Sequence, residues 1–464
     1  MSMTTITAEI ARRELGATFA GDLVGPSDAG YDAARAVYNA MVDRRPAVIA
    51  RCSSPNDVAA AIGFATRHDL LLAVRGGGHN GGGLGVCDDG MVVDLARLNA
   101  VEVDAGARTA RAGGGCTLNM LDAATHQAGL AVPGGIISTT GVGGLTLGGG
   151  IGHLTRRCGL TIDNLLEADV VLADGSRVRA SADENPDLLW ALRGGGGNFG
   201  VVTSFLFSAH PVAIVQAGPT FWPLERAPEV MRWYREFLPA APRDVNGFFA
   251  FLTVPPVELF PAELHNRKVC GVVWCHTGDA EAAARDLAAV HDAGAPLLHA
   301  VGPAPVPALQ TLFDGLYPPG LQWYWRADFV NELPDAAITA HHEWAEKLPT
   351  MHSTMHLYPI DGAAHDVGRS DTAWSYRDAM WSQVIVGVDP DPANASRIRQ
   401  WTVDYWEATH PYSAGGAYVN FMMDEGADRV RATYRDNYDR LAALKAKYDP
   451  GNVFRVNQNI PPGS

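Results

Sequence analysis

A histidine lies inside a run of glycines at residues 74–85, where the chain reads VRGGGHNGGGLG. Because glycine has no Cβ, such a run lets backbone N–H groups approach an anionic ligand closely and form a concave site for phosphate. The side chain of His79 would then contact the ligand that the glycines hold. The structural alternative is a flexible surface turn in which the histidine has no role.

Two more glycine clusters occupy residues 132–153 and 194–204. In the second of these, Gly195, Gly197 and Gly200 satisfy the pattern G-x-G-x-x-G. This cluster follows a predicted helix and precedes a predicted strand, the reverse of the Rossmann order, and no suitable acid lies about 20 residues later. The pattern therefore argues against a Rossmann NAD site. Several separate clusters indicate one large ligand with several polar parts, for which a dinucleotide is suitable.

The elements before the first run are those expected beside a ligand site. Residues 47–52 and 70–75 are apolar and predict two strands, with a helix at 57–68 capped by Ser54 or Asn56. Ligands collect at the ends of strands in open α/β arrangements. The position of the glycine run directly after the second strand therefore favours a binding site.

The sequence predicts short strands and helices up to about residue 212, and the amino-acid composition changes after this point. Residues 213–415 contain more aromatic residues and prolines, and their strands and helices indicate an α+β domain with helices on one face of the sheet. With 464 residues the chain exceeds the ~250–300 residues that one core supports, so two domains are expected. Strands are predicted at 91–95, 270–275, 322–329 and 355–360. Paired β segments are predicted at 100–112, with a turn at Gly106, and at 168–178, with a hairpin turn at Asp174-Gly175. Helices are predicted at 117–128, 187–193, 279–293, 335–347, 392–409 and 428–448.

The composition limits the partners. A net charge of −15 without a run of Lys or Arg argues against nucleic acid or an anionic membrane surface. The chain has no signal-peptide h-region and no apolar span of about 20 residues, so we expect a cytoplasmic protein with no membrane contact. The six cysteines form no CxxC pair, which indicates buried free thiols rather than a metal site or a disulfide framework.

Five segments, in order along nearly the whole chain, resemble the berberine bridge enzyme-like FAD-linked oxidases of the vanillyl-alcohol-oxidase (PCMH-type) flavoprotein class. Among these the chain is most similar to bacterial members of the 6-hydroxy-D-nicotine oxidase and enterocin-pathway flavin oxygenase kinds. The segments are RGGGH at 75–79, GVGGLTLGGGIG at 141–152, GLTIDN at 159–164, LWALRGGGGNFGVVT at 189–203 and YDPGNVFRVNQNI at 448–460.

The resemblance implies an α+β fold built from a two-part PCMH-type FAD-binding domain and an inserted substrate domain. The FAD-binding domain would comprise residues 1–212, with its core at about 40–212. The substrate domain would comprise residues 213–415, an antiparallel sheet covered by helices. Residues 416–464 would return to the FAD-binding domain.

The resemblance also implies FAD joined covalently through its 8α carbon to His79. Many relatives add a second bond from the cysteine of a G-x-C-P-T-x-G pattern. Here the equivalent segment, residues 135–141, reads GIISTTG and has Ile137 at that position. We therefore expect attachment through His79 alone, and Cys158, some twenty residues further on, is better explained as a buried structural thiol.

The other cofactor-binding residues implied by the resemblance come from the three glycine clusters and the C-terminal segment. Thr139, Thr140 and Asn198 are expected to donate hydrogen bonds to the pyrophosphate and the ring edge, and His153 stands where relatives often have tryptophan. The full set is Val74, Arg75, Gly76, Gly77, Gly78, His79, Asn80, Gly83, Leu84, Pro133, Gly134, Gly135, Ile137, Thr139, Thr140, Gly141, Gly143, Gly144, Gly148, Gly149, Gly152, His153, Asn164, Gly197, Asn198, Gly200, Val201, Val202, Tyr418, Asn457 and Asn459.

The implied chemistry is hydride transfer from substrate to flavin N5, with O₂ as acceptor and H₂O₂ as product. In sugar oxidases of the family the base is the last tyrosine of a Y-x-N-Y motif, whereas this chain reads YVNF and ends in Phe421. Tyr418 and Asn420 remain as catalytic candidates. An unperturbed tyrosine has a pKa of about 10, so Tyr418 would need a nearby cation to act as a base.

We expect the substrate to be a small secondary-metabolite-type alcohol, amine or activated carbon. The alternatives are a carbohydrate oxidase, which Phe421 disfavours, a flavin oxygenase acting on a polyketide, and a flavin-binding protein without turnover. Because strand residues alternate faces, Trp323 and Trp325 share one face and Tyr324 and Arg326 the other. Core packing explains these tryptophans equally well. The candidate substrate-binding residues are Trp323, Trp325, Arg326, His356 and Tyr376.

Overall fold

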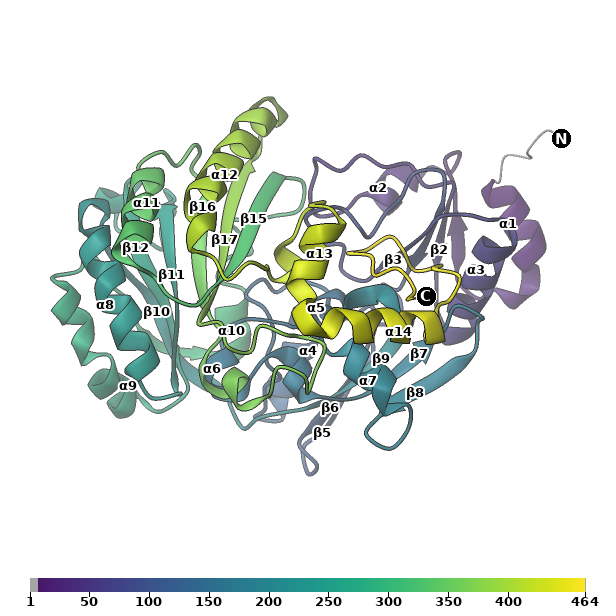
Figure 1. The fold of residues 1–464 in the computed structure, drawn as a ribbon, viewed down its shortest axis with the longest axis horizontal. Helices are drawn as coiled ribbons and strands as arrows, with labels where there is room; N and C mark the ends of the chain where they lie inside the picture. The colour runs from purple at the N-terminus through teal and green to yellow at the C-terminus, as the bar shows by residue number, and fades with distance from the viewer. Residues whose placement is uncertain (1–6, 464) are drawn as a thin grey trace.

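The computed structural model describes residues 7–463, so residues 1–6 and 464 of the predicted terminal segments lie outside the described part. Three β-sheets form the frame, and Figure 1 shows the sheet of β10–β17 beside the part of the chain that contains the other two. Within residues 7–463, no helix is both long enough and apolar enough to cross a bilayer.

Each sheet is built from strands that are consecutive along the chain, although their order within the sheet differs from the chain order. The first sheet, in the order β1-β2-β4-β3, consists of β1 (Asp22–Val24), β2 (Val48–Arg51), β3 (Leu72–Arg75) and β4 (Met91–Asp94). The second sheet, in the order β5-β6-β9-β7-β8, consists of β5 (Val101–Asp104), β6 (Thr109–Gly113), β7 (Leu165–Val171), β8 (Arg177–Ser181) and β9 (Val201–Ser208). The third, in the order β13-β10-β12-β11-β16-β17-β15 with β14 also paired to β10, consists of β10 (Ile214–Pro223), β11 (Val245–Thr253), β12 (Lys268–His276), β13 (Leu298–His299), β14 (Gly302–Pro305), β15 (Gln322–Val330), β16 (Thr354–Pro359) and β17 (Trp381–Asp389).

The first sheet delivers the first glycine run to its position. Strands β2 and β3 both pair in parallel with β4, and helix α3 (Pro55–Arg67) connects β2 to β3. The helix begins two residues before the predicted start at 57, because Ser54, one of the two predicted caps, accepts a hydrogen bond from the backbone N–H of Asp57 and Pro55 occupies the first turn. Strand β3 ends at Arg75, directly before the glycines, which confirms the predicted strand, helix and strand.

One face of the eight-stranded sheet is covered by helices, and the other face is directed toward the rest of the chain. Its strands are antiparallel, and α8 (Ala227–Ala240), α11 (Asp335–Ala345) and α12 (Ala395–Thr409) cover one face (Figure 1). In β16 the side chains of Met355 and Leu357 pack into the core beneath these helices. The predicted antiparallel sheet covered by helices is confirmed.

Of the remaining α-helices, α9 (Ala280–Asp286) lies near α8 beside the large sheet (Figure 1), and the others lie around the first two sheets and at the junction with the third. These others are α1 (Ala8–Leu15), α2 (Tyr31–Arg35), α4 (Leu118–Gln127), α5 (Val142–Gly148), α6 (Thr155–Cys158), α7 (Pro186–Leu192), α10 (Val306–Gln310), α13 (Ala427–Tyr434) and α14 (Tyr438–Tyr448).

Two of the predicted helix extents are wrong. The single helix predicted at 428–448 is divided into α13 and α14 at Arg435, which has a φ of 46°. The guanidinium of Arg435 lies 3.4 Å from the ring centroid of Tyr376 and donates to Asp378 at 2.8 Å, so tertiary contacts explain the break. The helix predicted at 279–293 ends at Asp286, and a 3₁₀ segment follows it.

A buried lysine ties α14 to the third glycine cluster and to the C-terminal segment. The Nζ of Lys445 donates to the carbonyls of Asn198 at 2.7 Å and Phe454 at 2.9 Å, and to the carboxylate of Asp449 at 2.6 Å. The side chains of Lys445 and Asp449 are fully buried. A buried ion pair is stable only while both partners remain.

We predict that Lys445→Met lowers the free energy of unfolding by about 3–5 kcal/mol, because it leaves the buried carboxylate of Asp449 without its cation. Lys447→Met is the matched control, since Lys447 pairs with Asp187 at the surface and is 55% exposed, where ion pairs contribute at most about 1 kcal/mol. Urea unfolding of both variants measures the difference. Equal losses would contradict this role of Lys445.

Candidate active site

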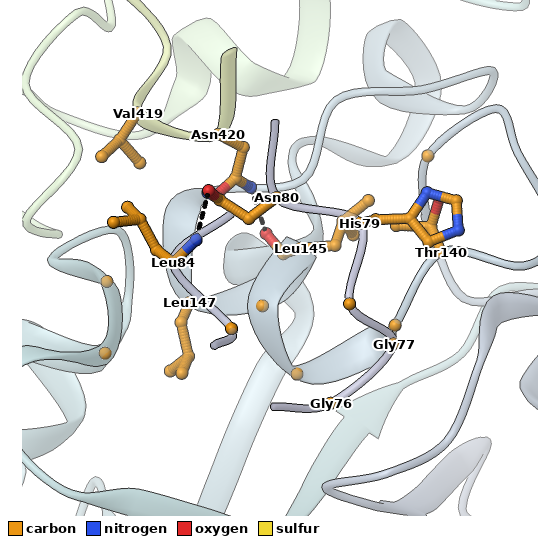
Figure 2. A pocket seen from close by; sticks show the side chains of 18 of the residues that line it. Gly76, Gly77, His79, Asn80, Leu84, Thr140, Leu145, Leu147, Val419 and Asn420 are labelled. Carbon is orange, nitrogen blue, oxygen red and sulfur yellow. Dashed lines mark hydrogen bonds between the residues drawn. The ribbon is translucent and has the colours of Figure 1, made fainter. Parts of the chain in front are cut away.

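A cavity of about 340 Å³ lies where the three sheets meet. Its walls come from the three glycine clusters, from β15, β16 and β17 of the large sheet, and from the segments at 418–421 and 454–458. Segments distant in the sequence therefore meet at one site, and Figure 2 shows residues of the first run, of α5 and of the 418–421 segment around it.

The first two glycine clusters touch backbone to backbone. A Cβ on Gly77 would lie 2.4 Å from the nitrogen of Gly141, and a Cβ on Gly141 would lie 2.3 Å from the nitrogen of Gly77. A side chain at either position would therefore force the two segments apart. Residues 142–148 of the second cluster form helix α5 instead of an open loop, so glycine serves here to allow close packing as well as to line the cavity.

His79 stands at the edge of the cavity between an aromatic ring and two hydroxyls. Its ring stacks on Tyr38 with the centroids 3.9 Å apart, Nε2 lies 2.9 Å from Thr139 Oγ1, and Nδ1 lies 3.5 Å from Thr140 Oγ1. Burial lowers the pKa of His79 to about 4. The imidazole is therefore neutral near pH 7 and keeps a nitrogen lone pair available for bonding.

The C-terminal side of the cavity holds Tyr418 and Asn420. The hydroxyl of Tyr418 accepts from the backbone N–H of Gly150 at 2.9 Å and from Asn420 Nδ2 at 2.7 Å. Asn420 Nδ2 also donates to the carbonyl of Leu145 on α5 at 3.0 Å (Figure 2). Burial raises the pKa of Tyr418 to about 12, against the opposite effect of the two donors. No cation contacts this hydroxyl in the described chain.

The large sheet supplies an aromatic and uncharged wall. Trp323 and Trp325 of β15 line the cavity, and both indole N–H groups are buried without a hydrogen-bond partner. Trp325 packs against the first glycine run so closely that a Cβ on Gly81 would lie 2.1 Å from its ring. Of the side chains that this sheet presents to the cavity in residues 7–463, none carries a fixed charge.

Most of the residues predicted from the sequence line this cavity. Those that do are Val74, Arg75, Gly76, Gly77, Gly78, His79, Asn80, Leu84, Gly135, Ile137, Thr140, Gly141, Gly143, Gly144, Gly197, Asn198, Gly200, Val201, Val202, Trp323, Trp325, His356, Tyr418, Asn420 and Asn457. Those that do not are Gly83, Pro133, Gly134, Thr139, Gly148, Gly149, Gly152, His153, Asn164, Arg326, Tyr376 and Asn459.

Several of the predicted polar residues have structural partners instead. Arg326 forms an ion pair with Glu425 at 3.0 Å, and the hydroxyl of Tyr376 donates to the carbonyl of Ala432 at 3.1 Å. Asn198 lines the cavity, but its Nδ2 donates to the carbonyls of Gly195 and Gln458. Asn198 was expected to donate a hydrogen bond to a cofactor, but its amide group donates to the protein backbone instead.

Other lining residues were missed by the sequence analysis. Tyr38 lies before the first glycine run, outside all the segments from which site residues were predicted, and no local pattern marks it. Thr354 and Tyr358 were detectable, since they share the strand face of His356 by simple alternation.

The cavity fits a large ligand such as FAD. A Cβ on Gly144 or Gly197, both of which line it, would meet no protein atom within 4 Å. The Oδ1 of Asn457 is buried there without a hydrogen-bond partner. Bare backbone facing open space and an unpaired buried acceptor are both expected at a site completed by a ligand.

Comparison with known proteins decides the family. The FAD binding domain family matches residues 46–181, and the berberine and berberine-like family matches residues 417–461. The chain is 31% identical to an FAD-linked oxidoreductase of Dictyostelium discoideum over 92% of this chain and 91% of that one. It is also 31% identical to (R)-6-hydroxynicotine oxidase of Paenarthrobacter nicotinovorans, over 95% of this chain and 97% of that one. This chain belongs to the berberine bridge enzyme-like FAD-linked oxidoreductases.

Solved structures confirm the fold expected for this family. The crystal structure of 6-hydroxy-D-nicotine oxidase from Arthrobacter nicotinovorans is 26% identical, has a TM-score of 0.85 and covers 96% of this chain and 98% of its own. Glucooligosaccharide oxidase from Acremonium strictum, described with a 6-S-cysteinyl, 8α-N1-histidyl FAD, has the same fold at 24% identity, with a TM-score of 0.86 over 99% and 100% of the two chains.

We predict that Gly144→Ala in this FAD-linked oxidoreductase lowers the bound FAD per chain at least tenfold without lowering the Tm of the cofactor-free protein. The added methyl group would project into the cavity, while alanine is favoured over glycine in a helix by about 1 kcal/mol. Gly315→Ala is the control, since its Cβ also meets no atom within 4 Å and lies outside the cavity. Equal FAD content in both variants would show that the cofactor does not cover Gly144.

Proposed function

We propose that this FAD-linked oxidoreductase is an oxidase with FAD attached covalently through His79, and that it oxidises a small uncharged aromatic molecule of the secondary-metabolite type. In this proposal residues 1–212 and 416–464 hold the cofactor and residues 213–415 hold the substrate. The observation that carries the proposal is the neutral, stacked imidazole of His79 at the edge of the glycine-lined cavity.

The surroundings of His79 favour a single covalent bond. A neutral imidazole is the form that can attack an electrophilic carbon, and the lowered pKa of His79 keeps it neutral at physiological pH. No cysteine of residues 7–463 lines the cavity, and Ile137 does. Cys158 is 9% exposed, packs in an apolar cluster with Cys275, and has a pKa raised by burial to about 12.

The residues of the chain would bind and orient the reactants. When bound, FAD supplies the acceptor for a hydride at N5 and passes the electrons to O₂, which forms H₂O₂. Asn420 fixes the position of Tyr418 against α5, and Tyr418 in turn holds the backbone at Gly150. We assign Tyr418 an orienting role, because both of its acceptor positions are already occupied.

The cavity wall indicates the substrate class. Uncharged, mostly apolar or aromatic side chains cover the side formed by the large sheet, so a carboxylate or phosphate on the substrate would lose its hydration without a compensating charge. The two unpartnered indole N–H groups of Trp323 and Trp325 can each donate to a carbonyl, ether or hydroxyl oxygen. An aromatic molecule with one or two such oxygens satisfies both conditions.

We predict that the denatured wild-type protein shows flavin fluorescence in its gel band, because a covalent bond survives unfolding. His79→Ala should give a dark band with free FAD in the supernatant, and Cys158→Ser should remain fluorescent, since Cys158 lies outside the cavity. Fluorescence of the unfolded bands and absorbance of the supernatants are the measurements. A dark wild-type band, or a fluorescent His79→Ala band, contradicts attachment through His79 alone.

A further inference from the structure

Three side chains of β16 face the cavity: Thr354, His356 and Tyr358. Two of them form a direct hydrogen bond, with His356 Nδ1 and the hydroxyl of Tyr358 2.6 Å apart. The pair is a consequence of strand geometry, since residues i and i+2 point to the same face. This contact brings a phenol and an imidazole together inside the substrate side of the cavity.

The pair lies in apolar surroundings that keep both groups uncharged. The ring of Phe248 packs against both, with centroid distances of 5.1 Å to His356 and 5.0 Å to Tyr358. The residues directly opposite His356 on the neighbouring strands are Ala250 and Val384. Burial lowers the pKa of His356 to about 3, and burial together with Tyr317 raises that of Tyr358.

The pair lies close to Phe421, a side chain that has no hydroxyl. Tyr358 lies next to Phe421, with a distance of 5.7 Å between ring centroids, so a hydroxyl is present close to the position where Phe421 provides none. Tyr418 is also near Phe421, at 4.7 Å, but its oxygen already accepts two hydrogen bonds. If the hydroxyl of Tyr358 donates its hydrogen bond to His356, the lone pairs of the Tyr358 oxygen are free to accept a hydrogen bond from a bound molecule.

We propose that Tyr358 and His356 together are the proton acceptor of this active site, and that the substrate is an aromatic alcohol. This inference rests on the proposed oxidation by FAD. As the carbon–hydrogen bond next to the hydroxyl breaks, its electron pair leaves with the hydride to the cofactor. The substrate O–H proton moves to the oxygen of Tyr358, the proton of Tyr358 moves to His356 Nδ1, and the substrate oxygen forms a carbonyl.

A weak base is sufficient for this reaction. An alcohol is not acidic at the start, but its oxygen becomes strongly acidic as the carbonyl forms, and proton transfer to a neutral imidazole then becomes favourable. The uncharged state of His356 is therefore useful, because burial lowers the pKa of the imidazole to about 3 and leaves it unprotonated and free to accept a proton near neutral pH. The acceptor also needs no preformed phenolate, which the apolar surroundings of Tyr358 disfavour.

The proposal is tested by binding two probes to the FAD-loaded protein and following the flavin absorbance. Phenol carries the proton that the pair would accept, and anisole has the same ring without it. Wild type is expected to bind phenol about five- to tenfold more tightly than anisole, the ratio that one hydrogen bond provides. Tyr358→Phe should reduce this ratio to near one while leaving the anisole affinity within twofold.

A second variant and a matched control separate this role from a structural one. In His356→Leu the hydroxyl of Tyr358 loses its acceptor and turns to the ligand as a donor, so the ratio should again approach one. Tyr405→Phe breaks a similar bond, of 2.7 Å to His341 Nδ1, on the helix-covered side of the sheet. It should lower stability but keep the phenol preference of wild type.

Turnover gives an independent readout. With 1-phenylethanol under anaerobic conditions, Tyr358→Phe is expected to slow flavin reduction about 100-fold with little change in substrate affinity, as loss of general-base assistance does. Absence of a phenol preference in wild type, or its persistence in Tyr358→Phe, overturns the proposal. Failure of wild type to hold FAD would instead overturn the proposed function, so the two failures are distinguishable.

Discussion

The site depends on the contact between the backbones of Gly77 and Gly141. Because no side chain separates them, the end of β3 and the start of α5 lie close enough to form one continuous surface. His79 follows Gly77 by two residues, and its ring is held by Tyr38 and by Thr139 from the second cluster. At Gly77 and Gly141, glycine is thus required by chain packing, and the shape of the cavity depends on this packing.

The same region also joins the large sheet. The amide of Asn39 donates to the carbonyls of Gly81 at 2.8 Å and Trp323 at 3.0 Å, and its oxygen accepts from the backbone N–H of Trp323 at 3.1 Å. One buried asparagine therefore fixes the distance between the glycine run and β15. The aromatic wall of the cavity and the neutral histidine at its edge are in this way parts of one rigid arrangement.

Much of this arrangement follows from local sequence patterns. The glycine clusters, the strand before the first of them and the alternation in β15 and β16 are properties of short segments, and they identify both His79 and the face that holds His356. The break at Arg435, the partners of Asn198 and the stacking of Tyr38 on His79 depend on residues far away in the chain. Sequence periodicity contains no information on such contacts, so the extent of the last helices and the detailed roles of these side chains needed the structure.

Within residues 7–463, the large sheet presents no fixed charge to the cavity, and this limits how the proposed reaction can be arranged. Transfer of a hydride removes negative charge from the substrate, so a proton must leave the substrate oxygen if the carbonyl product is to be neutral. A hydrogen-bonded pair of neutral groups meets this need better than an ion, since it accepts the proton only when the proton becomes available. Tyr358 and His356 form such a pair, whereas Tyr418, which already accepts two hydrogen bonds, is suited to hold the backbone of α5 and its following turn in position. Phe421 carries no hydroxyl, and in the proposed mechanism the proton acceptor lies instead on β16, next to Phe421.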